Sequence, residues 1–293
     1  MQKKTVVFIV NPISGKGRHR NIEDIIARNL DSSRFSFRVA VTGYASHARE
    51  LAREAVSSGA DIVAAVGGDG TVNEVAGVVA GTESTLAIVP CGSGNGLARH
   101  LGIPLDTAKA VRAVNSLNTE RIDYGTVNGR PFFCTCGMGL DARVSDRFSR
   151  SGRRGFLSYA RCVLKEWRMY KGESYSLKCG EGPADVIDAL LLTVANASQW
   201  GNNAVIAPGA SVNDGLLDVA AIKPFSFIKA PGLVWKLFRG KLKDGKSGYI
   251  SRTLEEFSVI RSQGGFIHVD GEPVWEEPVL FFRVCRSGLL ILR

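Results

Sequence analysis

The fold is decided by one stretch of sequence, Ile62-Val63-Ala64-Ala65-Val66-Gly67-Gly68-Asp69-Gly70-Thr71-Val72-Asn73-Glu74. Its first five residues are apolar and predict a short strand that is buried on both faces. Glycines and an aspartate follow directly, and a helical pattern continues through Val79. A buried strand that runs through a glycine turn into a helix is the repeating unit of parallel α/β sheets.

The same unit recurs along the first 120 residues, where short apolar segments alternate with segments of helical spacing. This alternation predicts an open parallel, Rossmann-like sheet with helices on both faces. The other predicted segments are, in chain order, strand Val6–Val10, helix Gly17–Leu30, strand Phe35–Val41, helix His47–Ser58, strand Leu86–Val89 and helix Asn95–Leu101.

From about Ile122 the pattern changes to closely spaced strands separated by turn residues, which predicts an antiparallel β-sandwich. One helical segment, Gly155–Lys171, interrupts them. We therefore predict two domains, 1–121 and 122–293, and leave open a return of the last strand to the first domain. The predicted strands are Thr126–Cys136, Ser174–Cys179, Val186–Ala195, Leu217–Ile222, Glu256–Arg261, Phe266–Val269, Val279–Cys285 and Leu289–Leu292.

Composition narrows the class of protein. The chain has 293 residues, 45% of them apolar, and a net charge of +9. These values exclude a disordered or collagen-like chain, and the positive charge favours an anionic partner. The apolar run Thr5–Val10 is too short for a signal peptide, and no run reaches the ~18 residues that span a bilayer. The six cysteines show no zinc spacing, so a reducing cytosol is the expected setting.

Three glycine-rich loops follow predicted strands of the first domain. Ligands of open α/β sheets bind beyond the carboxyl ends of the strands, where glycines admit phosphate oxygens and helix N-termini favour anions. One such loop is an ordinary turn, but three at successive strand ends predict a phosphate-bearing ligand. Asp69 would repel that phosphate, so we expect it to hold Mg²⁺ or to orient a hydroxyl. The loops are Asn11-Pro12-Ile13-Ser14-Gly15-Lys16-Gly17, Gly67–Thr71 and Gly92-Ser93-Gly94-Asn95-Gly96.

Two other glycine patterns are rejected on their context. The segment 240–247 fits G-x-x-x-x-G-K-[ST], but a phosphate-binding P-loop must leave a buried strand and open a helix, and its flanks predict neither. The segment 137–142 fits G-x-G-x-x-A, but it lies in the strand-rich half without a βαβ unit. The four histidines show no spacing typical of a zinc site or a catalytic triad.

Together these motifs resemble those of the diacylglycerol kinase/sphingosine kinase-type lipid kinases, in their bacterial two-domain form. The most specific block is Gly67–Glu74, which reads G-G-D-G-T-x-N-E. The resemblance runs nearly from end to end. The other matching blocks are Asn11–Gly17, Thr42 with His47–Ala52, Gly137–Ala142, Asn213–Leu217 and Asp270–Glu272.

The resemblance implies transfer of the γ-phosphoryl of ATP, bound in a cleft between an α/β domain and a β-sandwich, to a lipid hydroxyl. It implies Glu272 as the general base, presented by the hairpin turn that Asp270-Gly271 predicts. Asp69 would organise the Mg²⁺–phosphate network. A structural Mg²⁺ is implied at Ser211, Asp214 and Leu216. The residues implied to contact ATP are Asn11, Pro12, Ile13, Ser14, Gly15, Thr42, Gly67, Gly68, Asp69, Gly70, Thr71, Val72, Asn73 and Ser93.

One position departs from the bacterial pattern of the family. Gly96 stands where most bacterial members have an acid of the metal network, and this form of the loop is closer to sphingosine kinases. The acceptor is therefore left open between diacylglycerol and a sphingoid base. NAD kinase, which shares the G-G-D-G loop, and a non-catalytic nucleotide- or lipid-binding regulator are the alternatives. The Asn11–Gly17 block and the basic second domain argue against NAD kinase, and the joint presence of Asp69, Asn73 and Glu272 argues against the regulator.

The positive charge is concentrated in two segments of the second domain. Residues 147–171 carry eight basic and one acidic residue, and residues 223–246 carry seven and one. Both contain large apolar side chains, a mixture that suits a surface resting on anionic lipid. The alternative is an apolar side in the core and a solvated basic side. We expect a peripheral protein on the cytoplasmic side of the inner membrane, without a nucleic-acid partner, and leave a homodimer open.

Overall fold

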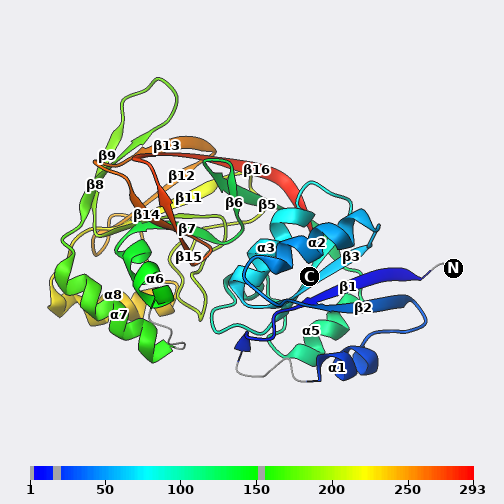
Figure 1. Cartoon of the computed structure of the whole chain (residues 1–293). Coiled ribbons are helices and arrows are strands. Elements are labelled where there is room, and N and C mark those ends of the chain that lie inside the picture. The colour runs from blue at the N-terminus through cyan, green and yellow to red at the C-terminus, as the bar shows by residue number, and fades with distance from the viewer. Residues whose placement is uncertain (1–2, 16–20, 151–155) are drawn as a thin grey trace. The chain divides into compact units, whose positions relative to one another are not determined.

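The computed structural model describes residues 3–15, 21–150 and 156–293, and it divides into two units (Figure 1). The first unit consists of Met1–Asp123 with Arg286–Arg293, and the second of Tyr124–Cys285. The C-terminal residues of the chain therefore belong to the unit that the N-terminal residues begin. No helix of the described residues is long and apolar enough to cross a membrane.

A parallel sheet forms the centre of the first unit. Its strands are ordered β2 (Phe35–Val41), β1 (Lys4–Val10), β3 (Ile62–Gly67) and β4 (Thr85–Pro90), and each neighbouring pair is parallel. The end of β16 (Val279–Leu292) joins β4 in parallel through Ile291 and Leu86. All residues of β3 and β4 are buried, because helices cover both faces of the sheet.

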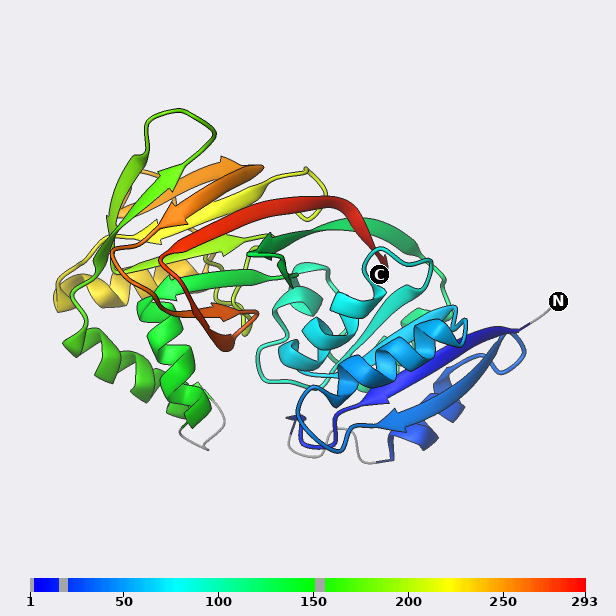
Figure 2. The same ribbon diagram turned by 45° about the horizontal axis from the view of Figure 1, so that its top comes forward.

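The helices of this unit divide between the two faces (Figure 1 and Figure 2). Val6, Phe8 and Val10 pack with residues of α1 and α5, so the alternate residues Val7 and Ile9 point to the face of α2 and α3. The prediction of an open parallel α/β sheet is confirmed. The helices are α1 (Ile22–Asn29), α2 (His47–Ser57), α3 (Asp69–Val79), α4 (Gly96–His100) and α5 (Thr107–Val114).

The second unit is built from antiparallel strands in two layers. One layer is the sheet β12 (Tyr249–Leu254), β11 (Leu217–Ile222), β10 (Leu191–Ala195), β7 (Thr135–Gly139), β14 (Gly265–Val269) and β15 (Glu272–Glu276). The other holds β5 (Thr119–Val127), β6 (Arg130–Phe132), β8 (Glu173–Lys178), β9 (Asp185–Ala189), β13 (Glu256–Ile260) and the first part of β16. Side chains of both layers share one core, which confirms the predicted sandwich.

Helices cover the outer face of the six-stranded sheet (Figure 1). They are α6 (Leu140–Arg150), α7 (Phe156–Met169) and α8 (Ala230–Phe238), which follows the short 3₁₀ helix η2 (Phe227–Lys229). Leu192 and Val194 point into the sandwich, whereas Leu191 and Ala195 point to the helices. Strand β10 is therefore apolar on both faces, as its sequence is.

Some predicted element boundaries are wrong. Val186–Ala195 forms two strands in different layers, because Leu190 leaves the second layer. Its N–H donates to Ile222 O of the six-stranded sheet, and its carbonyl accepts the N–H of Leu140 at the start of α6. Conversely, Val279–Cys285 and Leu289–Leu292 belong to one strand, β16. A mostly apolar run such as this one does not show where the chain passes from one sheet to the next. The rejected P-loop segment, 240–247, lies between α8 and β12, as its flanks indicated.

Candidate functional site

The three glycine-rich loops of the first unit meet at one edge of its sheet, because β1, β3 and β4 are neighbours. Asn11 N donates to Val66 O at 3.0 Å, and Cys91 N donates to Gly67 O at 2.8 Å. Each loop thus begins as a continuation of the strand pairing. The carboxyl edge of a parallel sheet is where ligands of such folds bind.

Asn11 connects the first loop to the second. Its side-chain amide donates to Thr71 Oγ1 at 3.0 Å, and its Oδ1 accepts the backbone N–H of Ile13 at 3.1 Å. Ser14 N donates to Asn11 O at 3.2 Å, which closes the turn. Asn11 therefore shapes its own loop and fixes it to the first turn of α3. Lys16 and Gly17 lie outside the described residues.

Glycines are needed where these loops cross. A Cβ on Gly15 would lie 1.9 Å from Cys91 O, and Gly15 has φ +70°. A Cβ on Gly92 would lie 2.6 Å from the Cα of Gly68. These two positions therefore need glycine because a neighbouring loop packs against them, and not only because a phosphate must approach the backbone.

Asp69 connects the second loop to the third. Its carboxylate accepts the backbone N–H of Asn95 at 2.8 Å and that of Gly96 at 2.6 Å, at the start of α4. Sequence reasoning assigned this carboxylate to Mg²⁺ or a hydroxyl, and did not foresee these backbone donors. Asp69 also begins α3, whose N-terminus has no side-chain cap within the described chain. An uncapped helix N-terminus favours an anion.

The other residues implied to contact ATP lie around the carboxyl edge of the sheet and differ in how exposed they are. Thr42, at the end of β2, is buried and donates its backbone N–H to Val10 O at 2.9 Å. Ser93 and Pro12 are exposed, as is Ile13. Val72 is buried in α3. The residues that are implied to contact ATP thus lie at the carboxyl edge of the parallel sheet, and among them Val72 is buried in the core.

The second group of implied residues lies on the hairpin of β14 and β15. Val269 pairs with Glu272, so Asp270 and Gly271 form a two-residue loop, with φ of 48° and 89°. Positive φ at both positions is typical of a type I′ turn, and the hairpin prediction is confirmed. Glu272 follows the turn and is exposed. The turn therefore presents a carboxylate that an incoming molecule can reach.

Asp270 holds this turn by accepting three backbone hydrogen bonds. The donors are the N–H groups of Phe133, Cys134 and Thr135, at 2.9, 2.8 and 2.9 Å. Asp270 is buried, and its own N–H donates to Thr135 O at 2.9 Å. The position of Glu272 thus depends on a buried carboxylate two residues before it.

A buried pair of side chains, Asp141 and His268, lies against the hairpin of β14 and β15. Asp141 Oδ2 lies 2.7 Å from His268 Nε2 and accepts Thr193 Oγ1 at 3.1 Å. Gly271 N donates to His268 Nδ1 at 3.2 Å. A Cβ on Gly137 would lie 2.2 Å from Asp141 Oδ2. This packing explains Gly137 and Asp141 of the Gly-x-Gly-x-Asp block and leaves that backbone no room for a dinucleotide. Sequence reasoning missed His268.

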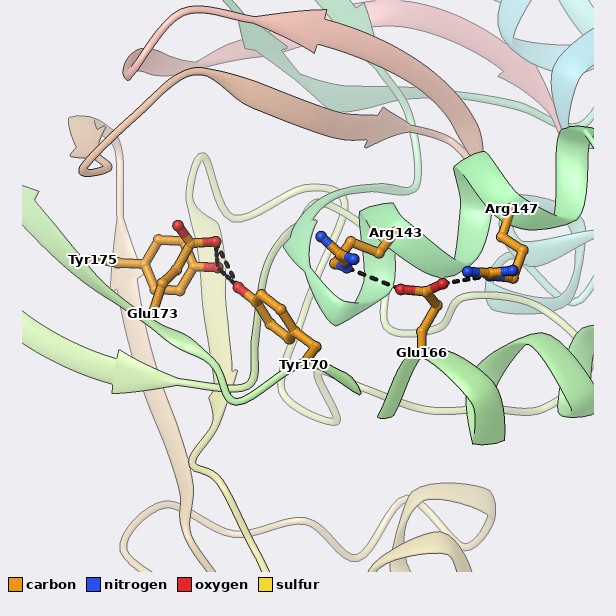
Figure 3. A network of polar contacts seen from close by, with 6 residues as sticks. All are labelled: Arg143, Arg147, Glu166, Tyr170, Glu173 and Tyr175. Carbon is orange, nitrogen blue, oxygen red and sulfur yellow. Dashed lines mark hydrogen bonds and ion pairs between the residues drawn. The ribbon is translucent and has the colours of Figure 1, made fainter. Parts of the chain in front are cut away.

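The remaining glycine of that block, Gly139, packs against the hydroxyls of two tyrosines. Figure 3 shows these tyrosines, Tyr170 and Tyr175, with Glu173. Tyr170 and Tyr175 donate to Glu173 Oε1 at 2.6 and 2.8 Å. Burial raises the pKa of both hydroxyls, so they remain donors at neutral pH. Gly139 has φ +76°, and a Cβ there would lie 2.6 Å from the Tyr175 hydroxyl.

Helices α6 and α7 are joined by Glu166, which also appears in Figure 3. Arg143 Nε donates to its Oε2 at 2.9 Å, and Arg147 Nε donates to Oε1. The Glu166 side chain is only 3% exposed. Burial opposes its ionisation, but the hydrogen bonds from Arg147 and Arg143 outweigh burial and hold the pKa of Glu166 below its usual 4.5. The i, i+4 spacing of the two arginines was the available sequence signal.

Glu166→Gln is expected to lower the free energy of unfolding at neutral pH by about 1–2 kcal/mol, since both arginines are partly exposed. The contribution of a carboxylate with a lowered pKa is present above its unfolded-state value and is lost as pH falls through the folded-state value. The difference from wild type should therefore shrink as the pH falls below 4.5, since the folded-state pKa of Glu166 lies below that value. Urea titrations by tryptophan fluorescence report on the second unit, which holds Trp167, Trp200, Trp235 and Trp275.

The matched control is Asp146→Asn, which removes the partly exposed i, i+4 partner of the exposed Arg150 on α6. Its unfolding free energy should stay within about 0.5 kcal/mol of wild type. A constant difference between Glu166→Gln and wild type at all pH values would contradict the role of ionised Glu166.

The turn implied to hold Mg²⁺ precedes β11. Leu216 N donates to Asp214 Oδ1 at 3.0 Å, and Ser211 Oγ donates to Asn213 Oδ1 at 2.7 Å. Burial and the nearby charge of Asp214 raise the pKa of Asp218 to about 6. Two neighbouring carboxylates that repel each other fit a hard cation. The described residues contain no group of three or more His, Cys, Asp or Glu side chains that could hold a metal.

Comparison with known proteins matches each half of the chain to a family. Residues 5–127 match the diacylglycerol kinase catalytic domain, and residues 134–292 match the YegS C-terminal NAD kinase beta sandwich-like domain. A protein of Pseudomonas putida described as "Probable lipid kinase YegS-like" is 32% identical, over 84% of this chain and 82% of its own. A diacylglycerol kinase of Mycobacterium tuberculosis is 32% identical, over 80% and 78%.

Solved structures show the same fold at lower identity. A diacylglycerol kinase from Bacillus anthracis has a TM-score of 0.74 at 19% identity and covers 100% of this chain and 97% of its own. An NAD kinase from Archaeoglobus fulgidus in complex with ATP has a TM-score of 0.54 at 15% identity, over 98% and 93%. At such identities the likeness concerns the fold alone.

Proposed function

The chain belongs to the diacylglycerol kinase and YegS-like lipid kinase family, and on that premise we propose that it transfers the γ-phosphoryl group of ATP to the hydroxyl of a membrane lipid. The observation that carries the proposal is the convergence of the three glycine-rich loops, fixed to one another by the bonds from Asn11 to Thr71 and from Asp69 to Asn95 and Gly96. In this proposal the first unit binds the nucleotide, and the second unit provides the general base, Glu272.

The nucleotide is held mainly by backbone. Phosphate oxygens accept N–H groups of Gly15, of the loop 67–71 and of Ser93, because the N–H groups of Asn11, Ile13 and Ser14 already donate within the protein. The uncapped N-terminus of α3 adds its positive dipole. The main role of Asp69 in this proposal is to hold the third loop in place through its hydrogen bonds from Asn95 and Gly96. Mg²⁺ bound with the nucleotide would neutralise the negative charge of the phosphates. This is needed because the Asp69 carboxylate lies beside them and would otherwise repel them.

The chemistry of the proposed reaction is an in-line displacement. Glu272 accepts the proton of the lipid hydroxyl, since that hydroxyl is a weak acid. The hydroxyl oxygen then bonds to the γ-phosphorus, and the bond from phosphorus to the β,γ-bridging oxygen breaks. ADP leaves with that oxygen. The exposed place of Glu272 after a fixed hairpin turn supports this assignment.

One assay tests the proposal and separates its alternatives. Purified protein, Mg²⁺ and γ-labelled ATP are incubated with diacylglycerol, a sphingoid base, ceramide, NAD or water alone. We expect label in diacylglycerol or the sphingoid base, and the preferred acceptor resolves the question that Gly96 raises. Label in NAD and in no lipid would overturn the proposal in favour of an NAD kinase. No transfer to any acceptor, with ATP still bound, would indicate a regulator.

A second measurement concerns the structural Mg²⁺ proposed at Ser211, Asp214 and Leu216. Mg²⁺ at about ten times its Kd should raise the free energy of unfolding by about 1.4 kcal/mol. Asp214→Asn should remove this gain, whereas Asp24→Asn, at an exposed acid of α1, should retain it. Thermal unfolding with and without Mg²⁺, in the absence of nucleotide, measures the effect. An equal gain in both variants would place the ion elsewhere.

A further inference from the structure

Helix α8 is apolar on all sides, although one side is exposed. Its sequence, Ala-Pro-Gly-Leu-Val-Trp-Lys-Leu-Phe, carries a single charge. Leu233 and Leu237 pack onto the outer face of the six-stranded sheet. Val234, Trp235 and Phe238 point outward and are 49%, 53% and 38% exposed. A helix on the surface of a protein normally has a polar outer side. The apolar outer side of α8 therefore indicates that a second apolar surface packs against it.

The exposed apolar surface continues into η2, directly before α8. Phe227 and Ile228 are 62% and 90% exposed. The Phe227 ring lies 5.4 Å from that of Trp167, which fixes η2 against α7. We use the name docking face for the five outward apolar residues Phe227, Ile228, Val234, Trp235 and Phe238. Large apolar side chains exposed together on one short segment point to an interaction site.

The segment that carries the docking face is strongly basic. Residues 223–246 carry a net charge of +6. The ammonium group of Lys241 lies 5.1 Å above the Trp235 ring, so positive charge stands directly at the apolar surface. The exposed basic residues of the segment are Lys223, Lys229, Arg239, Lys241, Lys243 and Lys246.

Among its described side chains, the other basic segment, 147–171, exposes less apolar surface than its sequence indicates. Trp167 and Tyr170 pack against the cluster beneath the helices. Leu164 and Met169 of α7 remain exposed, beside the exposed Lys165 and Arg168. The side chains of Phe156, Leu157 and Tyr159 lie outside the described residues.

We propose that the docking face rests in the interface of an anionic lipid bilayer, with its five apolar side chains below the headgroups and the Lys and Arg of the same segment at them. This extends the proposed function, because a bilayer holds the lipid acceptor. Apolar side chains combined with basic ones are typical of interfacial helices. A second copy of the chain would bring two faces of like charge together, and nucleic acid would gain nothing from Ile228 and Phe227.

Flotation of the full chain with vesicles, without ATP, tests the proposal. One vesicle contains phosphatidylcholine alone, and the other contains phosphatidylglycerol as about one third of the lipid. We expect binding to the anionic vesicle, and weaker binding as the salt concentration rises. The double variant F227S/I228S should lower the partition coefficient about tenfold or more, because two apolar side chains lose their burial. K241A should lower it about fivefold on anionic vesicles.

The matched control is Val186→Ser, a substitution of an apolar residue that is 62% exposed on β9. It should bind vesicles as wild type does. Thermal midpoints and gel filtration accompany every variant. Undiminished binding of F227S/I228S, an equal loss in Val186→Ser, or equal binding of wild type to both vesicles would overturn the proposal. A change of oligomeric state in F227S/I228S, with vesicle binding unchanged, would assign the face to a second copy instead.

These outcomes are independent of the kinase assay. F227S/I228S should phosphorylate a short-chain lipid in neutral detergent micelles as wild type does, and lose activity only on vesicles. If wild type phosphorylates no lipid but still binds anionic vesicles through this face, the proposed function fails and the docking proposal stands. If the variant is inactive in micelles as well, with its fold intact, the face acts in catalysis and the docking proposal fails.

Discussion

Glu272→Gln is expected to lower kcat for lipid phosphorylation by about 10²–10⁴-fold, the usual contribution of a positioned general base. Glutamine keeps the size of the side chain and can pair as β15 requires, but it cannot accept the proton of the lipid hydroxyl. KM for ATP should change little, since the residues implied to hold the nucleotide lie in the loops of the first unit. Initial rates with labelled ATP, at saturating lipid, measure both quantities.

The control for this substitution is Glu277→Gln, which removes an exposed carboxylate just beyond the same hairpin. It should turn over as wild type does. The rate of wild type should rise with pH as its base ionises, and Glu272→Gln should lack that rise. If Glu272→Gln keeps the rate and the pH profile of wild type, Glu272 is not the base and another acceptor for the proton must be found.

The sequence predicts the first unit well because its elements are locally determined. Strands such as β3 are continuous apolar runs bounded by glycines, and adjacent strands of a parallel sheet bring their loops together by topology alone. The function of the glycines was less predictable. Gly15 and Gly92 are required by contacts with residues of other loops, and the sequence contains no record of which loop lies opposite.

Pairings over long sequence distances could not be predicted from a single chain. Asp141 and His268 are 127 positions apart, and nothing in their local sequence identifies them as partners. The hairpin turn at Asp270-Gly271 was predictable from its two residues, but not the three N–H groups of 133–135 that Asp270 accepts. The turn chemistry is local, whereas the buried hydrogen bonds that place Glu272 depend on the complete sandwich.

Asp270→Ala should cost the second unit about 3–9 kcal/mol of unfolding free energy, because three buried N–H groups lose their acceptor at about 1–3 kcal/mol each. A loss of this size approaches the whole stability of a domain. Alanine is also strained at the φ of 48° that Asp270 adopts, whereas asparagine tolerates it. Urea titration by tryptophan fluorescence, which reports on the second unit, measures the change.

Two further variants separate the hydrogen bonds from the charge. Asp270→Asn keeps one acceptor oxygen and the backbone preference, so its loss should fall between wild type and Asp270→Ala. Asp185→Ala removes an exposed acid that pairs with Arg252 at 3.1 Å, and should cost less than about 1 kcal/mol. Equal losses in Asp270→Ala and Asp185→Ala would show that Asp270 does not hold the segment 133–135. Where Asp270→Asn remains folded, its kinase rate should still fall, because Glu272 follows the same turn and moves with it.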